Sequence, residues 1–461
     1  MKATNSIGIL GAGTWGLALA RLLYRNGHQV TVWSALPQEI TALNATHTHP
    51  NLPGMVIPVD IRFTTDDREV CEGKDILLFA VPSVFVRSTA ARVRAYVPDG
   101  QIIVDVAKGI EPDSLMTLTE VIRDELSKDG QHANVKLVAL SGPTHAEEVA
   151  LDMPTSIVSA CTDMQVAETV QDVFMNTCMR TYTNTDVLGV ELCGALKNII
   201  ALAAGMSTGL GFGDNAKAML ITRGMAEISR LGLAMGCAEQ TFNGLAGIGD
   251  LIVTATSVHS RNNRCGQLIG EGMEPADAVK AVGMVVEGIN ALPAALQLAQ
   301  RYHVELPIAA GVDAVVSGKI TAADMAMTLM TRDKTREVSQ REMNVRFESA
   351  VLRSLNQAPL RRTVVWGRFD TLNSQTLQTL RRLKAENGHL TVALQGNDDT
   401  RTERQLFLEA LRSVDAVIPA DTPAELLSVI RAQHATLVCA QDASALSFLR
   451  GSGVDVQGME G

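Results

Sequence analysis

The chain has 461 residues, of which 46% are hydrophobic and 20% charged. These values are typical of a globular protein of roughly two to four domains, and they exclude a disordered or fibrous chain. With 40 Lys and Arg against 50 Asp and Glu, the net charge is −10. No general positive field attracts nucleic acid or anionic lipid, so we expect no nucleic-acid partner and any anionic ligand must be held by local groups.

The seven cysteines are scattered, and none forms a CxxC pair. This usage favours a reducing cytoplasm and argues against a disulfide framework or a metal site. We find neither a signal-peptide pattern at the N-terminus nor a run of about 18 uncharged apolar residues. The sequence therefore predicts a cytoplasmic protein without a membrane span.

Strands and helices alternate in the first part of the chain. Residues 6–10 read as a buried strand, 17–26 as a helix and 29–33 as a second strand, and further strand-like apolar runs cover 75–81, 101–106 and 135–140. This rhythm predicts a parallel, doubly wound α/β sheet of the Rossmann type, which we assign to residues 1–185.

Helical spacing replaces the strands after about residue 185. Long stretches with apolar residues at i, i+3 and i+4 cover 187–206, 217–233, 275–282 and 288–302, which predicts an all-helical second domain at residues 186–340. Residues 341–360 read as a linker, and β-α alternation resumes at 361–461 as a separate small α/β domain.

A GxGxxG motif, Gly11-Ala12-Gly13-Thr14-Trp15-Gly16, lies between the first predicted strand and helix. Its glycines suit a tight turn, a close approach of a pyrophosphate and close helix–strand packing, so the motif predicts a dinucleotide site. An acid at the end of the second strand would favour NAD, whereas an arginine would favour NADP. Ser34 and Ala35 stand there instead, so the preference stays open, and Ser34 is a candidate cofactor contact.

Charged residues in apolar surroundings mark a second candidate site. Lys108 follows a buried strand, and Lys197 lies beside Asn198 within an apolar helix, where a charge is costly unless it is paired or used. Asp250, in a glycine-rich stretch, is a natural partner for a buried ammonium. Thr254 follows, and Ser260-Arg261-Asn262 offers a guanidinium beside an amide, a combination that suits a phosphate. Together with the dinucleotide motif, these residues suggest reduction of a phosphorylated carbonyl compound.

Because several motifs follow one another in the same order as in that family, residues from about 6 to 335 resemble a bacterial-type NAD(P)-dependent glycerol-3-phosphate dehydrogenase. The similarity lies in Gly194-Ala195-Leu196-Lys197-Asn198, Ala246-Gly247-Ile248-Gly249-Asp250-Leu251, Ser260-Arg261-Asn262, Ala107-Lys108-Gly109, Ser141-Gly142-Pro143-Thr144 and Val285-Val286-Glu287-Gly288. The resemblance implies a 6-phosphogluconate dehydrogenase-like helical domain, NAD or NADP as cofactor, and a product that feeds glycerophospholipid synthesis. We also expect a homodimer, because the apolar helices of the second domain are compatible with a dimer interface, although packing between the domains explains them equally well.

The resemblance also implies roles for individual residues. Lys197 would exchange the proton, with Asp250 and Lys108 completing the catalytic group. Substrate contacts would come from Lys108, Gly142, Thr144, Asn198, Asp250, Thr254, Ser260, Arg261 and Asn262. Cofactor contacts would come from Gly11, Gly13, Thr14, Trp15, Gly16, Ser34, Lys108, Ala146, Arg261, Val285 and Glu287.

Two other functions fit part of the pattern. One is a hydroxyacid dehydrogenase of the same two-domain architecture, but such relatives usually place an asparagine one helical turn after the lysine, where this chain has Ala201. The other is a nicotinamide-binding redox sensor without turnover, which would not need Lys197 and Asp250.

The C-terminal segment 361–461 resembles the glycerol-3-phosphate cytidylyltransferase-like nucleotidyltransferases through Val364-Val365-Trp366-Gly367-Arg368-Phe369-Asp370. The HxGH motif of that family is replaced by Asn373-Ser374-Gln375-Thr376. Uncharged side chains cannot stabilise the transferring phosphates, so we predict a non-catalytic domain.

Overall fold

The structure is a computed structural model. It describes residues 4–332, 362–370, 374–387, 389–396, 398, 400–409, 411, 413–433, 435–440 and 454–458. The chain divides into two compact units, Met1–Lys334 and Thr335–Gly461. The predicted linker 341–360 and Asn373 lie outside the described residues.

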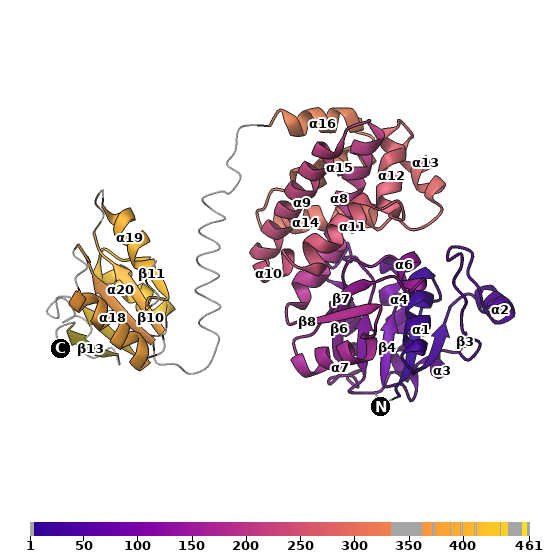
Figure 1. Cartoon of the computed structure of the whole chain (residues 1–461), viewed down its shortest axis with the longest axis horizontal. Coiled ribbons are helices and arrows are strands. Elements are labelled where there is room, and N and C mark those ends of the chain that lie inside the picture. Colours follow the sequence, from indigo (N-terminus) through magenta and orange to yellow (C-terminus); the bar gives the residue numbers. More distant parts are fainter. Residues whose placement is uncertain are drawn as a thin grey trace. The chain divides into compact units, whose positions relative to one another are not determined.

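An eight-stranded sheet forms the first half of the N-terminal unit (Figure 1). Its order is β3-β2-β1-β4-β5-β6-β7-β8, with β1 at Ser6–Leu10, β2 at Gln29–Trp33, β3 at Arg62–Thr64, β4 at Ile76–Phe79, β5 at Ile102–Asp105, β6 at Lys136–Ser141, β7 at Thr155–Ala160 and β8 at Met179–Asn184. The predicted doubly wound sheet is confirmed from β3 to β6. The expectation of an entirely parallel sheet is wrong, because β7 pairs with β6 antiparallel.

Helices cover both faces of this sheet. Apolar residues of α1 (Thr14–Arg25), α2 (Pro37–Thr46), α6 (Ala146–Ala150) and α7 (Met164–Phe174) share one core with Ile7, Ile9 and Val32. The other face packs against α3 (Asp67–Cys71), α4 (Val86–Val93) and α5 (Leu118–Leu126), and its core includes Leu10 and Trp33. Successive side chains of a strand thus pack into two different cores, one on each face of the sheet, which explains why the strands have nearly continuous apolar sequences.

The second half of this unit is helical and is built around α8 (Val187–Gly209). Around it lie α9 (Asp214–Ala234), α10 (Glu239–Phe242), α11 (Asp250–Thr256), α12 (Arg261–Gly270), α13 (Pro275–Val282), α14 (Glu287–Arg301), α15 (Pro307–Val316) and α16 (Ala322–Met330). Among the described helices, α8 alone is long and apolar enough to cross a membrane, but 89% of its most apolar window is buried inside this half. Its apolar character is explained by its position in the core.

Glycines allow α8 and α12 to pack closely. A Cβ on Gly205 would lie 2.0 Å from the carbonyl oxygen of Asn263, and one on Gly266 would lie 2.0 Å from that of Leu202. Both helices therefore approach backbone to backbone, as small residues permit. The consequence is that the first turn of α12 lies beside the middle of α8.

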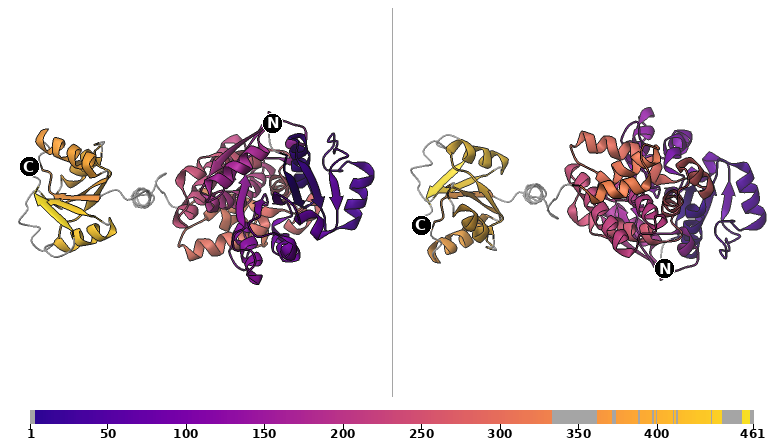
Figure 2. Two further views of the ribbon diagram at one scale, coloured as in Figure 1. Left: turned by 90° about the horizontal axis from the view of Figure 1, so that it is seen from below. Right: turned by 90° about the horizontal axis from the view of Figure 1, so that it is seen from above.

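The C-terminal unit contains a five-stranded parallel sheet in the order β11-β10-β9-β12-β13. Its elements are β9 (Arg362–Gly367), α18 (Ser374–Asn387), β10 (His389–Leu394), α19 (Arg401–Glu409), β11 (Ala416–Pro419), α20 (Pro423–Ala432), β12 (Leu437–Ala440) and β13 (Asp455–Gly458). Side chains of α18 and α19 pack on one face and those of α20 on the other (Figure 2). This unit is a small doubly wound α/β fold with its own core.

Candidate functional site

A cleft of about 820 Å³ lies between the carboxyl edge of the large sheet and the helical half. It brings together most of the residues that the sequence singled out. Those lining it are Gly13, Thr14, Trp15, Lys108, Thr144, Ala146, Lys197, Asn198, Thr254, Ser260, Arg261, Asn262, Val285 and Glu287. Gly11, Gly16, Ser34, Gly142 and Asp250 are not among the lining residues.

The glycine motif forms the turn from β1 into α1. Gly11 has φ +125°, and a Cβ there would lie 2.5 Å from the carbonyl oxygen of Ala80. A Cβ on Gly16 would meet the carbonyl oxygen of Gly11 at 2.1 Å, whereas one on Gly13 would meet no described atom within 4 Å. Gly13 caps α1 without a side chain, so the first N–H groups of α1 face open space. This cradle fits the pyrophosphate of a dinucleotide.

Lys108, Lys197 and Asp250 form a buried cluster at the centre of the cleft wall. Asp250 accepts hydrogen bonds from both ammonium groups: Oδ1 from Lys197, and Oδ2 from Lys108 at 2.7 Å. Lys108 also donates to the carbonyl oxygen of Gly142 at 3.1 Å. Two cations share one carboxylate, so the cluster carries a net charge of about +1 when all three groups are ionised.

Lys197 is 4% exposed, and Nζ donates to Oγ1 of Thr254 at 2.7 Å. That hydroxyl in turn donates to the carbonyl oxygen of Asp250, one helical turn earlier, at 2.7 Å. Burial is the main cause that lowers the pKa of Lys197 well below its ordinary value, and the Lys108 cation lowers it further, while Asp250 opposes both. An ammonium with a lowered pKa gives up its proton more readily near neutral pH.

The local backbone explains how these three side chains meet. Lys108 follows β5, and its stem lies against Gly194 of α8, where a Cβ would be at ordinary contact distance, 3.5 Å, from Cγ of the lysine and closer, 3.1 Å, to Oγ of Ser141. Asp250 was expected in a glycine-rich turn but is the first residue of α11, directly after a π-helical turn at Leu245–Gly249. Gly247 has non-helical dihedral angles inside this turn, so the chain kinks there, and the kink brings Asp250 to the start of α11 beside the two lysines.

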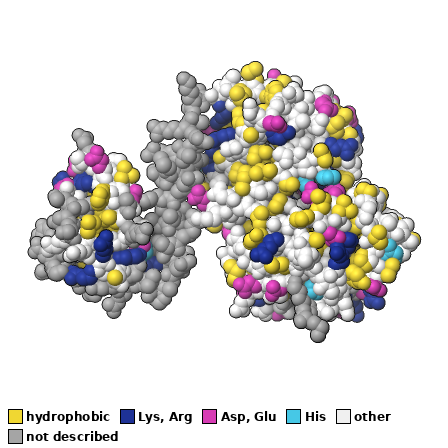
Figure 3. Space-filling model, viewed as in Figure 1, with side chains coloured by type: hydrophobic (Ala, Val, Ile, Leu, Met, Phe, Trp, Pro, Cys, Tyr) yellow, Lys and Arg dark blue, Asp and Glu magenta, His cyan; other side chains and the backbone are white. Residues whose placement is uncertain are grey.

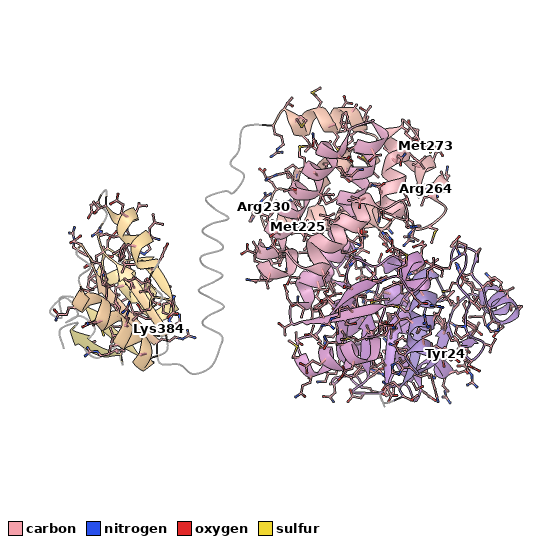
Figure 4. The ribbon with its side chains drawn as sticks, in the orientation of Figure 1. Tyr24, Met225, Arg230, Arg264, Met273 and Lys384 are labelled. Atoms are coloured by element: carbon pink, nitrogen blue, oxygen red, sulfur yellow. The ribbon has the colours of Figure 1, made fainter. Side chains whose placement is uncertain are left out.

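The N-terminus of α12 provides the cationic end of the cleft. Ser260 caps this helix by accepting a hydrogen bond from the backbone of Asn263, and Arg261 is exposed to the cleft. Arg264, which Figure 4 labels on the helical half, also lines it. No hydrogen bond or ion pair joins either guanidinium to another described residue, so both are available to an anion.

The amides of Asn198 and Asn262 connect α8, α12 and α14. Asn262 donates to Oδ1 of Asn198 at 3.0 Å and accepts from the backbone N–H of Gly288 at 2.8 Å. Asn198 donates to the carbonyl oxygen of Gly194. These contacts fix the orientation of both amides at the cleft wall.

Glu287 begins α14 and reaches across the cleft to the sheet-bearing half. Its carboxylate accepts from the backbone N–H of Ser83 at 3.1 Å and from the Ser83 hydroxyl at 2.5 Å. Val285 lies two residues earlier and Ala146 opposite, at the start of α6. This arrangement joins the two halves at the end of the cleft nearest the glycine turn.

Sequence reasoning missed His145, which also lines the cleft. Its ring contacts that of His259, and its Nε2 lies 3.4 Å from the carbonyl oxygen of Val253. Burial lowers the pKa of His145 below its ordinary value, and the nearby Lys197 cation adds to the effect. The signal was available, since His145 directly follows Thr144 in a segment already singled out.

No group of three or more His, Cys, Asp or Glu side chains suits a metal ion within the described ranges. On the face of the molecule in Figure 3, Lys and Arg side chains of the described residues lie in small separate groups among acidic and apolar ones. The cationic end of the cleft is therefore local, in keeping with the negative net charge.

Comparison with known proteins gives a consistent result for the N-terminal unit. Residues 6–167 match the model of the N-terminal part of NAD-dependent glycerol-3-phosphate dehydrogenase, and residues 186–327 match its C-terminal part. The chain is 66% identical over 334 residues to glycerol-3-phosphate dehydrogenase [NAD(P)+] 2 of Lactobacillus delbrueckii subsp. bulgaricus, covering 72% of this chain and 99% of the relative. It is 46% identical over 335 residues to the Bacillus subtilis protein, covering 72% and 96%.

A solved structure agrees with these sequence matches. The crystal structure of glycerol-3-phosphate dehydrogenase from Coxiella burnetii has a TM-score of 0.68 and 34% sequence identity, covering 71% of this chain and 99% of that one. The similarity therefore extends over the sheet and the helical half together.

Proposed function

The chain belongs to the NAD-dependent glycerol-3-phosphate dehydrogenase family, and from this premise we propose that its cleft interconverts dihydroxyacetone phosphate and sn-glycerol 3-phosphate with NAD(P)H. The product is the backbone of glycerophospholipids. The single observation that carries the proposal is the contact of the Lys197 ammonium with both Asp250 and Thr254 inside a cleft that also contains the glycine turn.

Bound nicotinamide supplies or accepts the hydride at C2 of the substrate. Gly11, Gly13 and Gly16 shape the cradle for the dinucleotide, with Thr14, Trp15, Ala146, Val285 and Glu287 as further contacts and Ser34 at the ribose end. The open N-terminus of α1 favours the phosphates by its free N–H groups and its dipole.

Lys197 donates its proton to the carbonyl oxygen of dihydroxyacetone phosphate as that oxygen gains negative charge, and it removes the proton in the reverse direction. Asp250 holds the ammonium in place and Thr254 fixes its direction. Lys108 contributes a second positive charge, and its bond to Gly142 orients it. The net positive cluster stabilises the developing alkoxide.

Arg261 binds the substrate phosphate, aided by Ser260, Asn262, Thr144 and the amide of Asn198. A planar guanidinium gives charge-assisted bonds to phosphate oxygens, so contacts remote from C2 orient the carbonyl toward Lys197. The exposed guanidinium of Arg261 at the cleft wall supports this assignment.

The decisive experiment is an absorbance assay of reduced nicotinamide with dihydroxyacetone phosphate as the substrate. We expect oxidation of NADH or NADPH that depends on this substrate, and the reverse reaction with sn-glycerol 3-phosphate. Turnover of a hydroxyacid in preference to the phosphorylated ketone, or binding of dinucleotide without any turnover, would overturn the proposal.

For the C-terminal unit we propose a degenerate cytidylyltransferase-like domain without catalytic activity. The observed parallel sheet in the order β11-β10-β9-β12-β13 suits a nucleotidyltransferase-like fold. In the sequence, Asn373 and Thr376 stand at the two histidine positions of HxGH and lack the charge that phosphoryl-type transfer needs. A structural or assembly role fits best. An assay for nucleotide transfer to sn-glycerol 3-phosphate should detect none.

We further propose that the protein is a cytoplasmic homodimer. All seven cysteines are free, which is usual in a reducing compartment. Sedimentation velocity tests the assembly, and a monomer at micromolar concentration would exclude it.

A further inference from the structure

The side chain of Glu39 brings a carboxylate to the end of β2, although the residues directly after this strand are Ser34 and Ala35. Ser34 directly follows β2, and its N–H donates to the carbonyl oxygen of Thr64. On the other side, the N–H of Gly11 donates to the carbonyl oxygen of Trp33 at 2.9 Å. Ser34 therefore lies beside the glycine turn, at the edge where the adenosine ribose of a dinucleotide binds in this fold.

Ser34 holds the side chain of Glu39 at this edge. Its hydroxyl donates to Oε2 of Glu39 at 2.5 Å and accepts from the N–H of Leu36 at 3.1 Å. Glu39 lies in the first turn of α2 and is half-buried, and no other described residue bonds to Oε1. One carboxylate oxygen is thus fixed by Ser34, while the other is free to accept a further hydrogen bond.

The segment from Ser34 to Ile40 offers no cation to an anionic partner. Glu39 is the one charged residue between Ser34 and Ile40. Arg92 stacks on the ring of Trp33, but that ring belongs to the core of the opposite sheet face, and the Nε of Arg92 is bound to both oxygens of Asp67 at 2.8 Å. This guanidinium is therefore already paired.

We propose that Glu39 makes the enzyme selective for NADH over NADPH. Its free oxygen accepts a hydrogen bond from the ribose 2′-hydroxyl of NADH, and its charge repels the 2′-phosphate of NADPH. The proposal rests on the function proposed above, since it assumes that the glycine turn binds a nicotinamide dinucleotide. Ser34 is then a positioning residue, whose hydroxyl directs the carboxylate.

The test is to measure the Kd of NADH and of NADPH for the full-length chain and for Glu39→Gln, by titrating the fluorescence of the reduced nicotinamide. We expect the wild type to bind NADH at least about tenfold more tightly than NADPH, and Glu39→Gln to reduce this ratio by about tenfold or more, mainly through tighter NADPH binding. Ser34→Ala, which keeps the carboxylate but releases it, should give an intermediate ratio.

Glu72→Gln is the matched control, because it removes one exposed carboxylate at the end of α3 and should leave the ratio unchanged. Equal affinities in the wild type, or an unchanged ratio in Glu39→Gln with a wild-type circular dichroism spectrum, would overturn the assignment. Turnover of dihydroxyacetone phosphate at equal rates with both cofactors would overturn it while sustaining the proposed function. Absence of turnover with either would instead contradict that function.

Discussion

Lys108 and Asp250 form an ion pair between the sheet-bearing and the helical half of the N-terminal unit, with Nζ of the lysine 2.7 Å from Oδ2 of the carboxylate. Lys108 follows a strand of the sheet, whereas Asp250 begins a helix of the other half. The bond therefore joins the two halves of the N-terminal unit beside Lys197, the proton donor that we propose. Because Asp250 also contacts Lys197, a single carboxylate governs both ammonium groups.

Replacing Asp250 by Asn should therefore affect activity and stability together. The change leaves the buried Lys197 ammonium without its anion, at a cost of about 3–5 kcal/mol, and lowers the pKa of that lysine further. We expect kcat to fall at least about a hundredfold at pH 7, with a lower Tm. A kcat within a few-fold of wild type would show that Asp250 does not hold the proton donor.

Lys197→Met should abolish proton exchange while keeping the apolar stem. We expect kcat to fall by about 10²–10⁴, the usual contribution of a positioned acid, with the Kd of NADH unchanged. Lys217→Met on α9 is the control, since this lysine does not line the cleft. Near-normal turnover in Lys197→Met would remove this residue from the mechanism.

The sequence predicted most of the first sheet because buried parallel strands are continuous apolar runs, as in residues 76–79 and 102–105. It missed β3, which has only 3 residues, β7 at Thr155–Ala160, and β8, whose polar residues alternate. It also missed the antiparallel pairing of β6 and β7, since the direction of a strand is set by its connections and leaves no mark on its composition.

For the site, the types and spacing of residues were enough to single out Lys197, Asp250 and Arg261. A charged side chain among apolar residues is costly unless it is paired or has a function. Glu39 escaped because its role depends on where α2 begins and on the rotamer that brings its carboxylate to Ser34. Such a contact depends on the three-dimensional fold and is not visible in the sequence alone. Lys108 was singled out together with Lys197, but its bond to Asp250 was not predictable, because it joins residues 142 positions apart.

Arg261→Ala should weaken binding of the phosphorylated substrate. Loss of a charge-assisted contact of about 1.5–3 kcal/mol corresponds to a rise of about 10–150-fold in the KM for dihydroxyacetone phosphate. With unphosphorylated dihydroxyacetone, the variant and the wild type should have similar kcat/KM values. Arg230→Ala is the control, because this arginine on α9 does not line the cleft (Figure 4). An unchanged KM for the phosphorylated ketone in Arg261→Ala would contradict the assignment.

Deleting residues 361–461 should leave kcat and KM within about twofold of the wild type. Every residue lining the cleft lies between Gly13 and Glu287, and the Lactobacillus delbrueckii relative is matched over 99% of its length without this segment. Kinetics with and without added sn-glycerol 3-phosphate, together with sedimentation, provide the readout. Altered product inhibition in the shortened chain would assign the C-terminal unit a regulatory role, and a changed sedimentation coefficient beyond the lost mass would assign it a role in assembly.

Glu191 of α8 should make the stability of the N-terminal unit depend on pH. Its carboxyl accepts hydrogen bonds from the Thr117 hydroxyl at 2.8 Å and from the Thr119 N–H and hydroxyl at 2.8 and 2.6 Å, at the start of α5. Burial nevertheless raises the pKa of Glu191 from 4.5 to about 7. The folded state therefore keeps a proton that the unfolded chain has already released between these two values.

The contribution of Glu191 to the free energy of unfolding is therefore greatest below about pH 4.5 and falls as the pH rises toward 7. For this group the total decrease is at most about 3 kcal/mol. Glu191→Gln does not titrate and keeps one acceptor for Thr119, so its stability relative to wild type should rise between pH 5 and pH 7.5. Urea unfolding of both proteins at half-unit steps measures this difference, with Glu72→Gln as the control for loss of an exposed carboxylate. A wild-type minus Glu191→Gln difference that stays constant over this range would show that Glu191 is ionised in the folded protein throughout.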